Sequence, residues 1–117
     1  MTADFSPDGQ FLATAGVDTT VKLWRPDGTL FKTLRGHQGN VRNVQFSPDG
    51  QWLASAGDAG KVQLWTVTGE RVRTFRTDFQ GIWGLAFSAD SQTLVVGGPS
   101  HPLEIWHIDG RRITLVD

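Results

Sequence analysis

The chain has 117 residues, of which 38% are hydrophobic and 20% are charged, and this composition favours a folded core over disorder. Eleven basic and twelve acidic residues leave a net charge of −1, so no strong field recruits nucleic acid or an anionic membrane. The sequence has no cysteine, no apolar run near the roughly 20 residues that span a bilayer, and no signal peptide at residues 1–10, so we expect a cytoplasmic protein without nucleic-acid or membrane partners.

A 41-residue repeat runs through the chain. Trp24, Trp65 and Trp106 lie 41 residues apart, and each follows an aliphatic residue. The same interval relates three further sets of identical residues, which are Phe5, Phe46 and Phe87, then Leu12, Leu53 and Leu94, then Gly16, Gly57 and Gly98. A period of this length predicts the blades of a β-propeller. The single domain 1–117 then divides into blade 1 at about 1–36, blade 2 at about 37–77 and blade 3 at about 78–117.

Each repeat is expected to form four short antiparallel strands joined by tight turns. The last hairpin turns of blades 1 and 3 are predicted at Asp27-Gly28 and Asp109-Gly110, pairs that two-residue loops favour. In blade 2 the strand-forming runs are 41–46, 52–56, 62–65 and 72–75. The turns between them fall at 47–50, 57–60 and 68–69.

Blade 3 departs from the pattern of the first hairpin turn. It has Ala89 and Ser91 where blades 1 and 2 have proline and glycine. Because serine has a steric cost at positive φ, we expect this turn to be looser than its counterparts. On the outer strands, basic side chains are expected to do no more than protect exposed sheet edges, and these are Lys32, Arg71, Arg73, Arg111 and Arg112.

Several segments of blade 2 together resemble the WD-repeat family. They are Phe-Ser-Pro-Asp-Gly at 46–50, Leu-Ala-Ser-Ala-Gly at 53–57, Leu64-Trp65 and the preceding Gly36-His37. The resemblance covers nearly the whole chain and implies an all-β fold with three four-stranded antiparallel blades of a WD40-type propeller. Because such propellers close with about 4–8 blades, three blades make a partial ring. The repeated Ser-Pro-Asp-Gly-Gln hairpin is similar to that of bacterial members.

In this family a blade is typically locked by a hydrogen-bonded tetrad of histidine, serine or threonine, aspartate and tryptophan. The resemblance assigns seven residues to such tetrads, which are Thr14, Asp18 and Trp24 in blade 1, His37, Ser55 and Trp65 in blade 2, and Trp106 in blade 3. Blade 2 has Ala59 at the aspartate position, where the neighbouring Asp58 could substitute. In blade 3, Asp78, Val96 and Ser100 stand at the other three positions.

Two groups of residues could carry chemistry instead. Ser55, His37 and Asp58 would form a nucleophilic triad, but they fall at or beside tetrad positions, so we favour the structural role. His101, Glu104 and His107 contain metal-ligand types, but their spacing suits a helix and this segment is expected to be a strand. We therefore expect no catalytic, cofactor or metal site and no enzymatic activity.

A possible partner-binding rim lies where the inner strands begin. Trp83 has no counterpart in the other repeats, so no packing rule of the repeat requires a tryptophan there. Aromatic and arginine side chains anchor protein interfaces, and the rim would comprise Asn40, Arg42, Asp58, Trp83 and His101. The alternative is that Trp83 fills the space between blades 2 and 3.

An isolated three-blade wedge would leave the apolar faces of its outer blades in water, which soluble monomers avoid. We expect further propeller blades to cover them, preferably in cis as parts of a longer propeller, otherwise from identical copies, with a dimer favoured over a trimer, or from a different chain. The sequence thus predicts a non-catalytic scaffold for a protein or peptide partner. The alternative is an enzyme or sensor whose site forms in the channel of the completed propeller.

Overall fold

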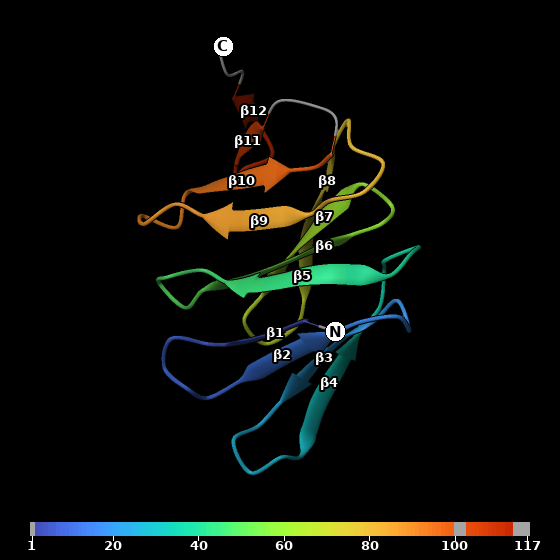
Figure 1. Ribbon diagram of the computed structural model, residues 1–117. Helices are drawn as coiled ribbons and strands as arrows, with labels where there is room; N and C mark the ends of the chain where they lie inside the picture. Colours follow the sequence, from blue (N-terminus) through green and yellow to red (C-terminus); the bar gives the residue numbers. More distant parts are fainter. Residues whose placement is uncertain (1, 100–102, 114–117) are drawn as a thin grey trace.

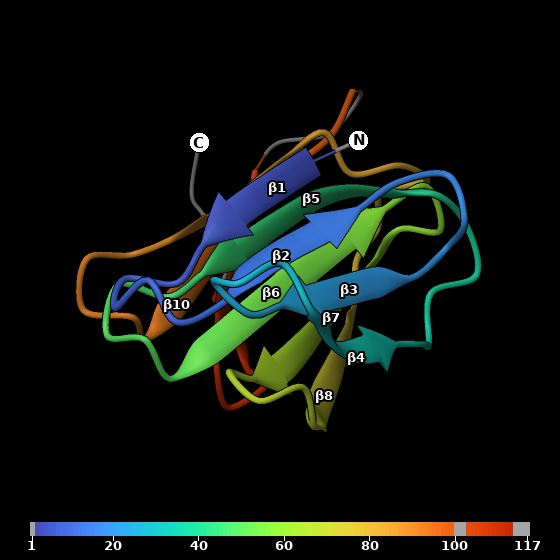
Figure 2. The same ribbon diagram turned by 90° about the horizontal axis from the view of Figure 1, so that it is seen from below.

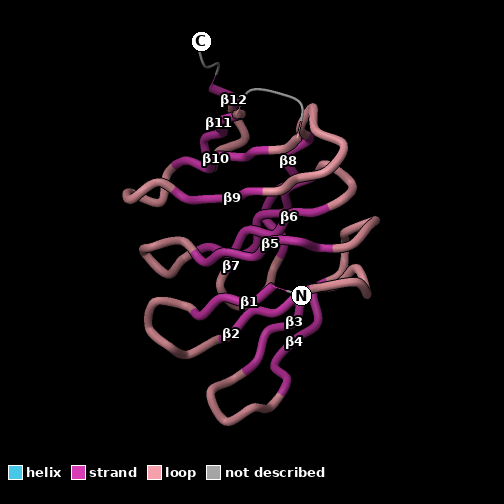
Figure 3. Tube along the Cα trace, viewed as in Figure 1, coloured by secondary structure: helices cyan, strands magenta, loops and turns pink. Residues whose placement is uncertain are grey.

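The computed structural model describes residues 2–99 and 103–113, and every regular element in them is a β-strand (Figure 1). Figure 3 shows no helix along this trace, so none of the described residues forms a helix long and apolar enough to cross a membrane. The strands are β1 Thr2–Phe5, β2 Leu12–Ala15, β3 Val21–Trp24, β4 Leu30–Leu34, β5 Val41–Phe46, β6 Trp52–Gly57, β7 Lys61–Thr66, β8 Arg71–Arg76, β9 Gly84–Phe87, β10 Thr93–Gly97, β11 Glu104–His107 and β12 Arg112–Ile113.

The strands form three separate four-stranded antiparallel sheets, β1 to β4, β5 to β8 and β9 to β12, each in chain order. This confirms the predicted all-β fold of three blades. The sheets are stacked one on the next, with β1, β5 and β9 following one another along the stack, and they do not close into a ring (Figure 1). Viewed from the end at which β1 lies, the sheets overlap (Figure 2).

The first hairpin turn has the same hydrogen bonds in all three blades. In blade 3 the Ser88 hydroxyl donates to Asp90, and Ser88 exchanges backbone and side-chain hydrogen bonds with Thr93, as Ser47 does with Asp49 and Trp52. Ser91 does adopt a positive φ of 61°, but its hydroxyl accepts a hydrogen bond of 3.0 Å from the Asp49 backbone N–H. The expectation of a looser turn is therefore wrong, because a bond between blades accompanies the strained backbone.

Each blade has two chemically different faces, because residues directly opposite on neighbouring strands share one face. The tryptophan face of blade 2 contains the row Phe46, Leu53, Trp65 and Arg71. Its aliphatic face contains the row Gln45, Ala54, Leu64 and Arg73. The corresponding rows at the 41-residue interval have the same orientation in blade 1. Blade 3 repeats them with one exception, because Ile105 pairs with Ile113, which lies 40 residues after Arg73.

The core consists of two seams in which an aliphatic face packs on the tryptophan face of the next blade. Seam 1 joins Ala13, Ala15, Val21, Leu23 and Leu34 of blade 1 to Val44, Phe46, Leu53 and Trp65 of blade 2. Seam 2 joins Ala54, Ala56, Val62, Leu64 and Phe75 of blade 2 to Leu85, Leu94, Val96 and Trp106 of blade 3. The two seams therefore use the same pair of faces.

Basic side chains of the outer strands complete the seams. Gly69 turns with a φ of +95°, and a Cβ there would lie 2.7 Å from Leu34 Cδ2 of blade 1, so the turn needs glycine to fit under β4. Lys32 of blade 1 also lies against this turn. In seam 2 the residue at the position of Lys32 is Arg73, which lies against the Gly110 turn of blade 3 and whose guanidinium donates to the Asp109 carbonyl. The expectation that these arginines only protect sheet edges is thus wrong for Arg73.

The same position is buried or exposed according to whether a blade covers it. Phe46 is 6% exposed because blade 1 lies on it, whereas Phe5, its counterpart on the uncovered tryptophan face of blade 1, is 67% exposed. At the other end of the stack, Leu103 is 54% exposed, whereas its counterparts Val21 and Val62 are fully buried. The structure thus has one open face of each kind.

Candidate functional site

The predicted tetrad of blade 2 contains three side chains that are linked in series by hydrogen bonds. Trp65 Nε1 donates to Ser55 Oγ at 2.9 Å, and Ser55 Oγ lies 2.7 Å from His37 Nε2. Since the hydroxyl accepts from the indole, its own proton is available to a neutral imidazole. Burial lowers the pKa of His37 to about 4, with a smaller contribution from the charge of Lys61. These hydrogen bonds therefore orient the Trp65 indole towards seam 1, and burial keeps His37 neutral at pH 7.

Asp58 does not extend this series of hydrogen bonds. Its carboxylate binds the Arg42 guanidinium on the rim, and its backbone N–H donates to the Asn40 carbonyl. Ser55 is fully buried and His37 is bound to it, while the carboxylate of the supposed triad points to another partner. The three residues therefore form no nucleophilic triad.

Blade 1 has the corresponding pair of hydroxyl and indole. Trp24 Nε1 donates to Thr14 Oγ1 at 2.9 Å. Asp18 is directed elsewhere, since its carboxylate accepts from the Thr20 backbone N–H and pairs with Lys22 at 2.6 Å, which lowers the pKa of Asp18 to about 2. A hollow of about 350 Å³ lies beside Thr14, Asp18 and Trp24.

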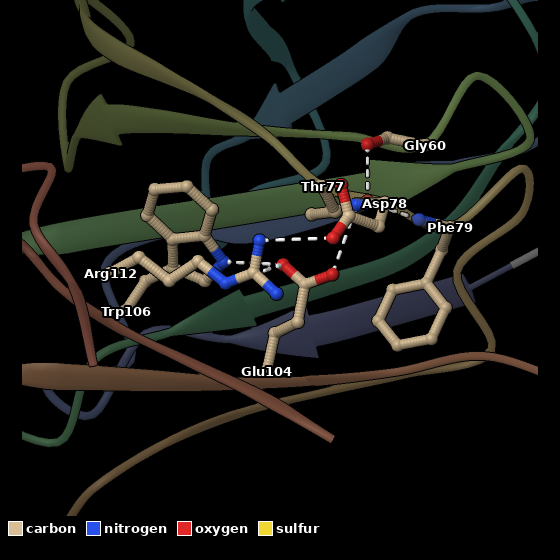
Figure 4. Close-up of polar contacts among 7 residues, drawn as sticks. All are labelled: Gly60, Thr77, Asp78, Phe79, Glu104, Trp106 and Arg112. Carbon is tan, nitrogen blue, oxygen red and sulfur yellow. Dashed lines mark hydrogen bonds and ion pairs between the residues drawn. The ribbon is translucent and has the colours of Figure 1, made fainter. Parts of the chain in front are cut away.

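Blade 3 uses a carboxylate in place of the missing hydroxyl (Figure 4). Glu104 is buried on β11, two residues before Trp106, and its Oε1 accepts from the Trp106 indole at 3.0 Å. Its Oε2 accepts from the Asp78 backbone N–H at 2.9 Å. Arg112 adds an ion pair of 3.0 Å to Asp78 and lies 3.9 Å from Glu104. We call Glu104, Trp106, Asp78 and Arg112 the carboxylate clamp.

The sequence carried a signal for this clamp that the tetrad assignment missed. Position 104 corresponds to Gln63 in blade 2, which donates to the Gly36 carbonyl at 3.2 Å. Both side chains therefore bind the backbone that leads into their own blade. A glutamate on a buried strand requires hydrogen-bonding partners. Val96 stands where blade 2 has Ser55, so the Trp106 indole has no hydroxyl acceptor. The glutamate at position 104 and the valine at position 96 therefore compensate each other.

The predicted rim residues within the described part of the chain lie at one edge, where β5 and β9 begin and β6 ends. Arg42 and Asp58 form an ion pair there, which raises the pKa of the Arg42 guanidinium. Trp83 is 69% exposed, so it does not fill the space between blades 2 and 3. His101, the remaining predicted member, lies outside the described residues.

Two hydrogen bonds fix the backbone of this rim at Trp83, one within blade 3 and one from blade 2. The Trp83 N–H donates to the Gly97 carbonyl at 2.8 Å, and the Trp83 carbonyl accepts from Asn43 Nδ2 of blade 2 at 3.1 Å. Between blades 1 and 2, Asn40 and Arg42 border a hollow of about 300 Å³ together with the exposed Val17. The rim thus presents an indole, an aliphatic side chain and an ion pair on rigid backbone.

The residues considered for a metal site bind different partners. Glu104 belongs to the carboxylate clamp, and His107 Nδ1 lies 3.2 Å from the Asp109 carboxylate at the last turn. Over residues 2–99 and 103–113, no three histidine, cysteine or acidic side chains group together as metal ligands.

The fold and these contacts define the chain as an array of propeller blades. The sequence profile of the family described as "WD domain, G-beta repeat" matches residues 1–25, 28–66 and 69–101, and the chain belongs to this family. Its structure is similar to the crystal structure of the RRP9 WD40 repeats, with a TM-score of 0.91 and 20% sequence identity over 97% of this chain. The chain spans 37% of the length of that structure, and at this identity the likeness concerns the fold.

The neutral His37 makes stability depend on pH. Its folded pKa of about 4 lies below the unfolded value near 6.5, so the unfolded chain binds more protons between these values. The free energy of unfolding should therefore be constant above about pH 6.5 and fall by about 2 kcal/mol between pH 7 and pH 4.5. Urea unfolding at both pH values measures this fall.

Two variants separate His37 from other titrating groups. His37→Gln should lose most of the fall between pH 7 and pH 4.5, whereas His107→Gln, which changes a histidine at the last turn of blade 3, should keep it. An unchanged fall in His37→Gln would show that another group is responsible.

The carboxylate clamp predicts that a second substitution in blade 3 offsets part of the stability lost when Glu104 is replaced. In Glu104→Gln the amide N–H₂ faces either the Trp106 indole N–H or the Asp78 backbone N–H, so two donors meet. The substitution should lower the free energy of unfolding by about 1–3 kcal/mol. Val96→Ser alone should also destabilise, because it buries a hydroxyl beside an indole that is already bonded. The double variant recreates the Ser55 and Gln63 arrangement of blade 2, so it should be more stable than the sum of the single effects by about 1 kcal/mol.

Urea unfolding at one protein concentration measures these three variants. Glu70→Gln, which removes an exposed carboxylate, is the control and should change stability by less than about 0.5 kcal/mol. Strictly additive effects of Glu104→Gln and Val96→Ser would contradict the compensation between the two positions.

Proposed function

We propose that the chain is a non-catalytic scaffold that binds a protein or peptide partner at the rim formed by Val17, Asn40, Arg42, Asp58 and Trp83. The observation that carries this proposal is the exposed indole of Trp83 on a backbone fixed from two sides. Such a side chain loses little conformational freedom when a partner covers it, which is why tryptophan anchors many interfaces.

The surroundings of Trp83 favour a peptide with mixed polarity. The Arg42 and Asp58 ion pair offers both a donor and an acceptor beside the apolar Val17 and Trp83. Membership of the WD-repeat family supports a scaffold, since these repeats are typical of protein-interaction domains. The seams support a role within a larger ring, with the remaining blades supplied in cis or by identical copies.

A selection experiment with peptides of random sequence tests the rim. Peptides from a phage-displayed library are selected on the immobilised chain, and their affinities are measured for the chain and its variants. Trp83→Ala and Arg42→Ala should each weaken the selected peptides, by about 30-fold for Trp83→Ala if it is a hot spot.

Val72→Ala is the matched control, because Val72 is exposed on the outer strand β8, away from the rim. It should leave the affinities unchanged. Peptides that bind wild type and Trp83→Ala equally well, or a selection that yields no binding peptide, would refute the proposed rim.

A further inference from the structure

Most basic side chains without a carboxylate partner gather at the outer edge of seam 1. Within residues 2–99 and 103–113, the basic residues that form ion pairs with carboxylates are Lys22, Arg42, Arg111 and Arg112. Of the rest, Arg25 lies over the Phe31 ring and Arg73 donates to the Asp109 carbonyl. The others are Lys32, Arg35, Lys61, Arg71 and Arg76. All of them lie on β4, β7 or β8 or directly after β4, and β4 and β8 lie on the side of the stack away from β1 and β5 (Figure 2).

Two of these side chains are held against the link between β4 and β5. Arg71 Nη1 lies beside Gly36, 3.0 Å from the point that a Cβ there would occupy. Lys61 Nζ donates to Gln38 Oε1 at 3.0 Å. Lys32 reaches the same seam from blade 1, against the turn that precedes β8. We define the basic edge as Lys32, Lys61, Arg71 and Arg76.

A pair of like charges faces each other across the outer strands of blade 2. Lys61 of β7 stands directly opposite Arg76 of β8, and like charges at such a position destabilise the strand pair. The main cause of the lowered pKa of His37 is burial, and the charge of Lys61 adds to it, so the positive potential extends to the link. In the part of the chain that the structure describes, no carboxylate, that of the neighbouring Glu70 included, forms an ion pair with Lys61 or Arg76. The fold therefore holds two like charges together without an internal counterion.

Seam 2 shows the same edge neutralised from within. Arg112, the counterpart of Arg71, pairs with the carboxylate of Asp78 in the link and lies 3.9 Å from that of Glu104 (Figure 4). The seam 1 counterparts of the acidic residues Asp78, Glu104 and Asp109 are His37, Gln63 and Thr68. Seam 1 therefore keeps the basic side chains but lacks the carboxylates that bind them in seam 2.

We propose that the basic edge binds an acidic segment of a partner protein, whose carboxylates take the role that Asp78 and Glu104 have in seam 2. Ammonium and guanidinium groups along one edge suit several carboxylates of an extended peptide, and an arginine can form two parallel hydrogen bonds with one carboxylate. Arg71 and Arg76 are exposed, so the peptide reaches them without rearrangement of the blades. This site does not depend on the rim, because it lies on the outer strands and the rim lies where the inner strands begin.

A peptide suits this edge better than a nucleic acid does. Proteins that bind single-stranded nucleic acids combine a basic groove with aromatic side chains on which the bases stack. The exposed aromatic residues of the described ranges are Phe5 on β1 and Trp83 before β9, and neither belongs to an outer strand. In seam 2, moreover, the groups that the counterpart arginine binds are carboxylates.

Fluorescence anisotropy with two synthetic peptides of equal length tests the proposal. Both peptides are labelled with fluorescein, and glycine alternates with glutamate in one and with glutamine in the other. The glutamate peptide should bind the chain with a dissociation constant of about 100 μM or tighter at about 20 mM NaCl, where screening is weak. Binding should weaken several-fold at about 150 mM NaCl, where the Debye length is about 8 Å. The glutamine peptide should not bind.

Variants that remove a charge locate the binding site. Lys61→Gln and Arg76→Gln should each raise the dissociation constant of the glutamate peptide about two- to five-fold, and the two together about 10-fold. Arg111→Gln is the matched control, because it removes an exposed arginine of blade 3 that pairs with Asp109, and it should leave the affinity unchanged. Circular dichroism checks that each variant is folded.

Gln38→Glu tests the role of the missing carboxylate with almost no change of shape. The side-chain oxygen that accepts from Lys61 Nζ at 3.0 Å then carries a negative charge, so it competes with the peptide for the ammonium group. The variant should bind the glutamate peptide about two- to five-fold more weakly. Urea unfolding should show no loss of stability, which separates this competition from damage to the fold.

The outcomes that would overturn the proposal differ from those that concern the rim. Trp83→Ala should bind the glutamate peptide as tightly as the wild type does, and a loss of binding in this variant would place the peptide at the rim. No binding of the glutamate peptide at low salt, equal binding of the glutamine peptide, or full affinity after both Lys61→Gln and Arg76→Gln would each refute the basic edge as its site. A labelled single-stranded oligonucleotide that binds more tightly than the glutamate peptide, and weakens in the same variants, would assign the edge to nucleic acid instead.

Discussion

The packing of a tryptophan face on the aliphatic face of the preceding blade is the interaction on which this structure depends. A single four-stranded sheet of this size has too little apolar surface to fold alone, so each blade gains its stability from its neighbours. Ala13 lies in the same apolar cluster as Trp65, and Trp106 packs against the cluster that contains Ala54, so the seams combine small aliphatic side chains with large indoles. The rim is rigid for the same reason, since hydrogen bonds between stacked blades fix the backbone around Arg42 and Trp83.

The hydrogen bonds to the three repeat tryptophans orient the indoles for these seams, and different acceptors serve this purpose. Thr14 and Ser55 accept the indole proton through a hydroxyl, whereas Glu104 accepts it through a carboxylate. The carboxylate needs further partners once it is buried, and it finds them in Asp78 and Arg112. What is maintained across the blades is therefore the position of the tryptophan, while the chemistry of its acceptor varies.

The sequence predicts the architecture well because repeat period, turn residues and strand patterns all depend on local chemistry. The three four-stranded blades and the family were confirmed. Glu104 was missed because the tetrad pattern directs attention to positions 78, 96 and 100, and compensation from a different position depends on which side chains face each other across strands. Ser91 and Arg73 were misjudged for a related reason, since their partners, Asp49 and Asp109, belong to neighbouring blades. Local rules describe one blade, and these contacts arise only when blades are stacked.

The central claim, that blades stack through these two faces in a defined register, can be tested directly by nuclear Overhauser spectroscopy. The Gly69 turn of blade 2 lies against Leu34 and Leu23 of blade 1. Cross-peaks from the Gly69 Hα protons to the methyl groups of Leu34 and Leu23 should therefore be present. Contacts within one blade, such as that between the paired residues Val44 and Ser55, provide the internal reference. Reference cross-peaks without any between Gly69 and Leu34 or Leu23 would show that the sheets form but do not stack in this register, which would contradict the account.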